Sequence, residues 1–150
     1  MARIRSIKPD FFFSDDLAEL SPYTRLGFIG LWCHADKAGR LEDSPKILKA
    51  KIFPFEEIDF ENLLCELAGG EFVLRYVIDG ERFIQIVNFQ KHQRPHHTEP
   101  ESVIPAPLKD GETTVGQPCL DLKQKVGMDQ GMDQGMDQGN DLDQGRAGLS

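Results

Sequence analysis

The repeat at residues 127–145, GMDQGMDQGMDQGNDLDQG, limits where this chain can build a hydrophobic core. It contains almost no branched or aromatic side chains, so it buries too little apolar surface to offset the entropy of ordering it. Residues 98–118, TEPESVIPAPLKDGETTVGQP, have the proline, glycine and acidic content that is typical of a linker. We therefore expect residues 1–97 to form one domain, which is long enough for a core, and residues 98–150 to be a disordered acidic tail.

The chain as a whole is acidic, with 17 Lys and Arg against 25 Asp and Glu and a formal net charge of −8. Residues 98–150 hold most of this excess, since their net charge is −6 and that of residues 1–97 is −2. The acidity therefore does not exclude a nucleic-acid partner for the domain. The sequence contains neither a long apolar run nor a charged-then-apolar signal segment, so we expect a soluble cytoplasmic protein without membrane contact.

Three segments of the domain carry helix start signals. A Ser-Pro pair beginning at Ser21 opens a strongly apolar helix, which we expect at the centre of the core. A second Ser-Pro pair predicts a helix over residues 45–53, which ends before a proline. Asp59 is the expected cap of a third helix over residues 59–68, which a Gly-Gly pair terminates.

The end of the domain carries strand signals. Residues 71–78 and 82–89 alternate between apolar and polar side chains, and the Asp-Gly pair at residues 79–80 predicts a tight hairpin turn between them. Residues 40–41 are expected to form a very short strand between the first and second helices. This order predicts an α+β fold of the winged helix-turn-helix type, with three helices and a C-terminal β-hairpin wing.

Three stretches of the chain resemble a known family. They are ARIRSIKPDFF at residues 2–12, LSPYTRLGFIGLWCHADKAGRLEDSPKILKAKIFP at residues 20–54 and RYVIDGERFIQIVNFQKHQRPHH at residues 75–97. The resemblance covers about residues 2–105 and is to the N-terminal domain of phage and prophage replication-initiation proteins, also called replisome organisers. It implies a winged-helix domain that binds origin DNA, which we expect to be duplex, or that helps to assemble the replisome in a bacterial host cell.

In that family a variable linker and a C-terminal part that engages the host helicase-loading machinery follow the winged helix. We expect this last part to be missing here, which would affect helicase loading and leave DNA binding intact. Whether the protein forms a homo-oligomer is left open.

Positive charge in the domain falls on the N-terminal arm, the second helix, the hairpin and the stretch after it. If these segments converge, they form a discontinuous basic surface that is suited to contacts with DNA phosphates. The alternative is that they are ordinary solubilising charges. The candidate DNA-binding residues are Arg3, Arg5, Lys8, Lys46, Lys49, Lys51, Arg75, Arg82, Lys91, His92 and Arg94.

The third helix would enter the major groove in the usual docking of a helix-turn-helix, but its polar positions are mostly acidic. They are Asp59, Glu61, Asn62 and Glu66. Carboxylates that face phosphates lower affinity, so we expect this helix not to bind the DNA backbone. Exposed carboxylates with scattered basic residues would favour the alternative function, a protein-assembly module or a transcriptional regulator without strong DNA affinity. A shared basic face away from this helix would favour DNA binding.

Residues 88–97, NFQKHQRPHH, allow three interpretations. A zinc site would need His92, His96 and His97 to meet a cysteine, and no Cys-x-x-Cys partner is present, so we expect no metal site. We expect instead that Phe89 closes the apolar face of the hairpin and that the basic side chains follow the DNA backbone. A purely solvated terminus is the third interpretation.

Catalytic motifs are not apparent in the sequence. The chain lacks a Gly-x-x-x-x-Gly-Lys phosphate loop, a serine elbow and a Cys/His nucleophile pattern. The carboxylate pairs at residues 15–16, 42–43 and 56–57 are typical of turns and helix starts. We therefore expect no enzymatic activity, no catalytic residue and no cofactor.

Overall fold

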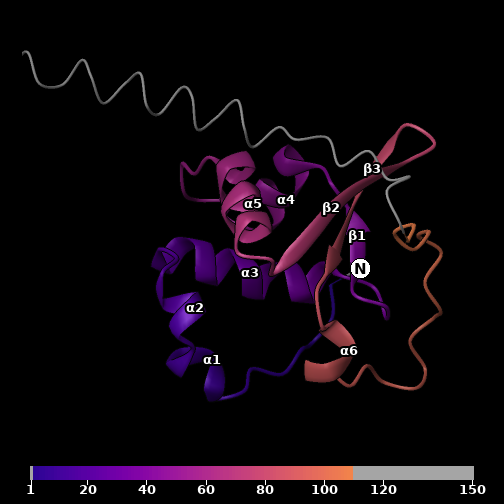
Figure 1. Cartoon of the computed structure of the whole chain (residues 1–150), viewed down its shortest axis with the longest axis horizontal. Coiled ribbons are helices and arrows are strands. Elements are labelled where there is room, and N and C mark those ends of the chain that lie inside the picture. Colours follow the sequence, from indigo (N-terminus) through magenta and orange to yellow (C-terminus); the bar gives the residue numbers. More distant parts are fainter. Residues whose placement is uncertain (1, 110–150) are drawn as a thin grey trace, which may run out of the picture. The chain divides into compact units, whose positions relative to one another are not determined.

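The computed structural model describes residues 2–109. Within them the chain forms six helices and a three-stranded antiparallel sheet (Figure 1), which confirms the predicted mixture of helix and sheet. Residues 110–150 of the tail, which the sequence predicts to be disordered, lie outside the described residues. No helix within residues 2–109 is long and apolar enough to cross a membrane. The elements are α1 (Asp10–Phe13), α2 (Asp15–Ala18), α3 (Pro22–His34), β1 (Arg40–Glu42), α4 (Pro45–Ile52), α5 (Phe60–Gly69), β2 (Val73–Ile78), β3 (Glu81–Ile86) and α6 (Phe89–His92).

The longer helices begin at the predicted caps. The Ser21 side chain accepts a hydrogen bond from Thr24 N at 3.2 Å, and Asp59 Oδ1 accepts one from Asn62 N at 3.1 Å. Each bond satisfies an amide group that a helix leaves open at its start. The second Ser-Pro pair likewise stands at the start of α4. Side-chain capping therefore marks the start of α3 and α5, whereas Ser44 at the start of α4 forms no side-chain cap hydrogen bond.

The strands β2 and β3 form the predicted hairpin. Asp79 and Gly80 have positive φ angles of 52° and 83°, as the central residues of a type I′ turn require. β1 pairs antiparallel with β3, with Leu41 opposite Ile84, so the order in the sheet is β1-β3-β2. The short predicted strand thus extends the hairpin to a sheet.

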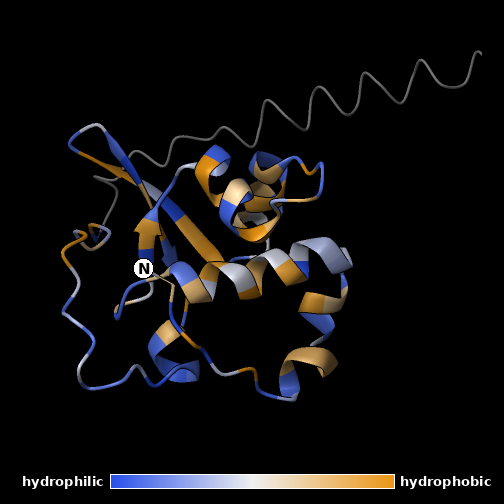
Figure 2. Ribbon diagram, turned by 180° about the vertical axis from the view of Figure 1, so that it is seen from behind, coloured by the Kyte–Doolittle hydropathy of each residue, from blue (hydrophilic) through white to orange (hydrophobic). Residues whose placement is uncertain are grey.

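Helix α3 lines the core as predicted and packs closely on α4 and α5 through two glycines. A Cβ atom added at Gly30 would lie 2.5 Å from Ile52 Cγ2, and one at Gly27 would lie 2.7 Å from Leu63 Cδ1. Hydrophobic residues of the helices and of the strands gather in this region (Figure 2). Leu26 is 53 % exposed, so α3 also has an outer side.

The helices α1, α2 and α6 have no counterpart among the sequence predictions, because a helix of four residues shows too little periodicity to detect. Residues 87–89, expected to continue the last strand, leave the sheet instead. Asn88 has a φ of 59° and precedes α6. Phe89 is buried at the start of α6, where it joins the core.

Residues 99–105, which we call the strap, contact the domain beyond the expected boundary at residue 97. Tyr76 Oη donates a hydrogen bond to Pro105 O at 2.7 Å, and Arg40 Nη1 donates one to Ile104 O at 3.0 Å. The strand register places Tyr76 and Arg40 on the sheet face opposite Leu41, which belongs to the core. The strap therefore contacts the second face of the sheet.

Candidate nucleic-acid interface

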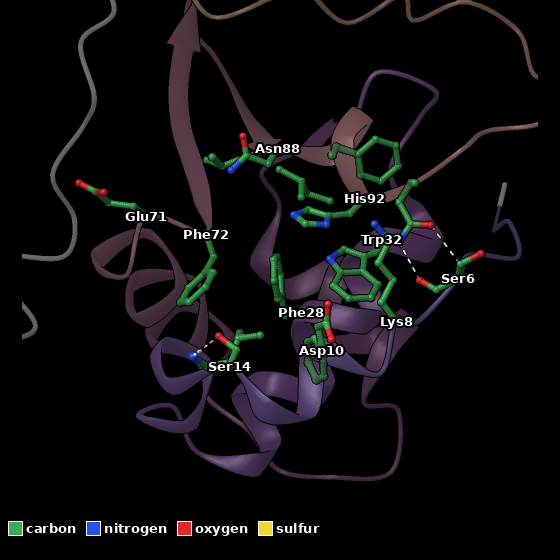
Figure 3. Close-up of a pocket in the computed structure, with 16 residues that line it drawn as sticks. Ser6, Lys8, Asp10, Ser14, Phe28, Trp32, Glu71, Phe72, Asn88 and His92 are labelled. Atoms are coloured by element: carbon green, nitrogen blue, oxygen red, sulfur yellow. Dashed lines mark hydrogen bonds between the residues drawn. The ribbon is translucent and has the colours of Figure 1, made fainter.

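Two basic segments that lie far apart in the sequence are joined in the fold. They are residues 2–9, which we call the arm, and residues 88–97, and neither contains an Asp or Glu. The buried Gln93 side chain bridges them, because its Nε2 donates to Ser6 O at 2.8 Å and its Oε1 accepts from Ser6 N at 3.0 Å (Figure 3). The Arg5 guanidinium also lies 5.3 Å from the centre of the Phe89 ring, a cation–π distance.

This junction carries four exposed basic side chains, Lys8, Lys91, His92 and Arg94, which we call the arm surface. Within the described part of the chain, none of the four forms a salt bridge. The buried Phe89 anchors α6 below them. These four candidates are therefore brought together on a base that is fixed by Gln93 and Phe89.

Arg3 and Arg5 are occupied by contacts inside the domain. Arg5 Nη1 lies 2.6 Å from Glu99 Oε1, and Arg3 Nε lies 3.2 Å from Glu99 Oε2. Both also donate to Ala35 O at the end of α3, at distances of 2.9 Å and 3.1 Å. The Arg5 hydrogen bond and the two positive charges lower the pKa of the Glu99 carboxyl. Through these contacts Arg3 and Arg5, which were expected to contact phosphates, fasten the arm to α3 and to the strap.

Arg75 is buried, so its guanidinium is not exposed for the expected contact with DNA. Its Nε and Nη2 donate to the two Asp43 oxygens at 2.6 Å and 2.9 Å, and its Nη1 and Nη2 donate to the Glu61 oxygens at 2.8 Å and 3.1 Å. Burial by itself would lower the pKa of Arg75, but these hydrogen bonds and charges raise it above its ordinary range. Arg75 thus links β2 to α5 and to the segment after β1.

Arg82 shares the carboxylates that bind Arg75. Its Nη2 lies 3.7 Å from Asp43 Oδ2 and 3.9 Å from Glu61 Oε1, and its side chain is 47 % exposed. The strand register places Arg82 opposite Val77, so it lies diagonally across the hairpin from Arg75 and not directly opposite. Arg82 remains partly accessible to solvent.

The three lysines of α4 form a separate group. Lys46 and Lys51 are exposed and Lys49 is half-buried. Figure 1 shows α4 beside α5 and distant from α6. The arm surface and the α4 lysines thus occupy different ends of the domain, so the condition that the basic segments converge on one surface is not met.

The acidic side chains of α5 have partners within the domain. Asp59 caps the helix, and Glu61 pairs with Arg75. Glu66 accepts hydrogen bonds from Thr24 Oγ1 at 2.8 Å and from Asn62 Nδ2 at 3.1 Å. The carboxylates that argue against groove binding by this helix thus serve as hydrogen-bond and ion-pair partners within the domain.

Histidines 96 and 97 lie at the end of the second basic segment. Their ring centres are 4.2 Å apart, and His96 Nδ1 lies 2.7 Å from Thr98 Oγ1. Among residues 2–109, no three His, Cys, Asp or Glu side chains are grouped so that they could hold a metal ion.

A pocket of about 370 Å³ lies beside the arm surface, and the sequence reasoning did not predict it (Figure 3). Its interior is mostly aromatic and aliphatic, and Lys8 and His92 of the arm surface contribute to its lining. The aromatic residues of the DFFF run at residues 10–13 and Trp32 are visible in the sequence. A pocket is formed by distant segments, however, and no local pattern connects them. The apolar lining consists mainly of Phe11, Leu17, Phe28, Trp32, Phe72, Ile86, Val87 and Phe89.

Comparison of the chain with protein-family models, with curated proteins and with solved structures gives no match.

Proposed function

We propose that this protein is a DNA-binding module of phage-type replication initiation, and that the arm surface is its principal contact with DNA phosphates. The observation that carries the proposal is the junction at Gln93. It joins two segments without carboxylates, so that Lys8, Lys91 and Arg94 are exposed together. Clustered Lys and Arg are the usual means of neutralising a phosphate backbone, and the two segments themselves contain no carboxylate, although Asp10 follows the arm directly.

The element order supports a winged-helix scaffold for this surface. Helices α3, α4 and α5, with β1 between the first two, precede the hairpin, and β1 pairs with β3 as the third strand. A scaffold is not a function, however, so the roles in origin binding and replisome assembly rest on the family resemblance. Host helicase-loading proteins as partners, and a bacterial cytoplasmic location, rest on the same resemblance.

A protein-assembly module is the second candidate, favoured by exposed aromatic side chains. Phe12 and Phe13 of α1 are 66 % and 83 % exposed, and Phe55 after α4 is 93 % exposed. Large exposed apolar side chains mark protein interfaces when they form a patch. The separation of the α4 lysines from the arm surface also favours this candidate.

Two triple variants test the proposal, each of which removes three positive charges. Lys8→Ala/Lys91→Ala/Arg94→Ala removes the arm surface, and Lys46→Ala/Lys49→Ala/Lys51→Ala is the matched control. At 0.15 M salt, three phosphate contacts contribute roughly 100-fold to affinity, about fivefold each by counterion release. We expect the arm triple to lose this factor in fluorescence anisotropy on every DNA sequence, whereas the α4 triple stays within a few fold of the unmodified protein.

Circular dichroism melts establish that both variants are folded. A loss of affinity in the α4 triple alone would place the phosphate contacts on α4 and contradict the proposal. If the unmodified protein binds neither duplex nor single strands, the assembly function takes its place.

A further inference from the structure

The pocket beside the arm surface combines an apolar interior with a polar mouth. Phe28 and Phe89 are buried at 6 % and 3 % exposure, while Trp32 and Phe72 are partly exposed. In Figure 3, Phe28 lies between Phe72 and Trp32 in the interior. The Phe28 and Trp32 ring centres are 5.2 Å apart at 72°, and Phe28 also lies 5.6 Å from Phe72, so the lining contains a cluster of aromatic rings.

The size of the pocket suits one flat ring system. An apolar cavity of ~150 Å³ holds a single benzene ring. The volume of about 370 Å³ therefore has room for a one- or two-ring heterocycle. It lies near the lower end of the range of ~300–1,000 Å³ that is usual for small-ligand sites.

The polar lining of the pocket holds Lys8 and His92 together with two carboxylates, Asp10 and Glu71. Lys8 and His92 are exposed, line the pocket and belong to the arm surface, so a phosphate bound there lies next to the opening. Asp10, Ser14 and Asn88 also line the pocket and can accept hydrogen bonds from the amino groups of a base. A purely apolar protein side chain would leave this combination of cations and acceptors unused.

We propose that this pocket binds one unpaired nucleobase and that the protein therefore prefers single-stranded to duplex DNA. The inference rests on the proposed function, because the arm surface supplies the phosphate contacts. A base within a duplex is stacked and paired, and it can enter a pocket only after it is flipped out at a cost in free energy. An unpaired base stacks on aromatic side chains without this cost.

The first test changes the DNA and leaves the protein intact. Three probes are compared by anisotropy: an eight-nucleotide strand with a base at every position, the same strand with abasic sites throughout, and an abasic strand with one central adenine. Stacking of one base contributes about 5- to 100-fold to affinity. We expect the single adenine to restore most of the affinity of the full strand, since one pocket takes one base. Equal affinities for the full and the fully abasic strands would overturn the inference.

The second test uses the tryptophan that lines the pocket, which is the single Trp of the chain. We expect its fluorescence to be quenched by the adenine-containing strand and unchanged by the fully abasic strand. Phe72→Leu should weaken single-strand binding at least about fivefold and leave duplex binding unchanged. Phe13→Leu is the matched control, because Phe13 is 83 % exposed and does not line the pocket.

The outcomes separate the two proposals. If the arm triple weakens binding to both forms of DNA while the abasic strand binds as well as the full strand, the DNA-binding function stands and the nucleobase pocket is refuted. If no DNA binds, both are refuted, and an apolar side chain of a protein partner becomes the alternative occupant.

Discussion

Replacement of Arg75 by Met should destabilise the domain severely, because it removes both hydrogen bonds from the buried Asp43 carboxylate and leaves it only the distant Arg82. The Asp43 side chain is 1 % exposed, and it receives two hydrogen bonds from Arg75. Removing one partner of a buried ion pair costs roughly 3–5 kcal/mol. For a domain of this size each kcal/mol lowers the melting temperature by about 4–8 °C, so we expect a decrease of at least about 12 °C.

Two further variants show whether the buried charge is the cause. Arg82→Met should cost at most about 1 kcal/mol, because Arg82 is half-exposed and its distances to the carboxylates are long. Asp43→Asn in the Arg75→Met background should recover part of the lost stability, since the buried carboxylate, which then has only Arg82 at 3.7 Å, is replaced by a neutral amide. Thermal melts followed by circular dichroism measure all three. An Arg75→Met variant that melts within about 4 °C of the unmodified protein would refute the reasoning.

Two other substitutions test the fold around the arm. Gly39→Ala should cost about 1–2 kcal/mol for its positive φ and about 1–3 kcal/mol for overpacking, because the new Cβ would lie 2.5 Å from Phe89 Cβ. Gly80→Ala has open space around the new Cβ and should show the cost of the positive φ alone. Equal losses of stability in denaturant melts would contradict this. Glu99→Gln should loosen the strap at neutral pH, which hydrogen exchange of residues 99–105 would detect. In the unmodified protein the pKa of Glu99 lies below its ordinary value of 4.5, so the stabilisation by its ion pairs is complete above that pH and is lost as the pH falls through the lowered pKa. The Gln variant should lack this acid dependence, and exchange rates identical to those of the unmodified protein would show that Glu99 does not hold the strap.

Much of the fold could be predicted from the sequence, because its signals are local. Ser21 and Asp59 satisfy amide groups only three residues away, and the Asp79-Gly80 turn depends on the φ angles of two adjacent residues. The strap could not be predicted in this way. Its proline-rich, acidic composition is typical of a linker, but its contacts come from Tyr76 and Arg40 of the sheet.

The sequence shows which segments are basic, but it does not show which basic side chains stay exposed. All eleven basic candidates are plain in the sequence, but which of them finds a carboxylate depends on contacts between distant segments. Arg75 and Asp43 are 32 residues apart, and Arg5 and Glu99 are 94 residues apart. No local pattern distinguishes these arginines from Lys91 or Arg94, which remain exposed.

The salt dependence of DNA binding tests the central claim, that the arm surface binds phosphates, most directly. Affinity for one random duplex is measured between 50 and 200 mM salt for the unmodified protein and for the arm and α4 triple variants. We expect the slope of log affinity against log salt to be smaller by about 2.7 for the arm triple, about 0.9 for each lost contact, and unchanged for the α4 triple. An arm triple with an unchanged slope would contradict the account.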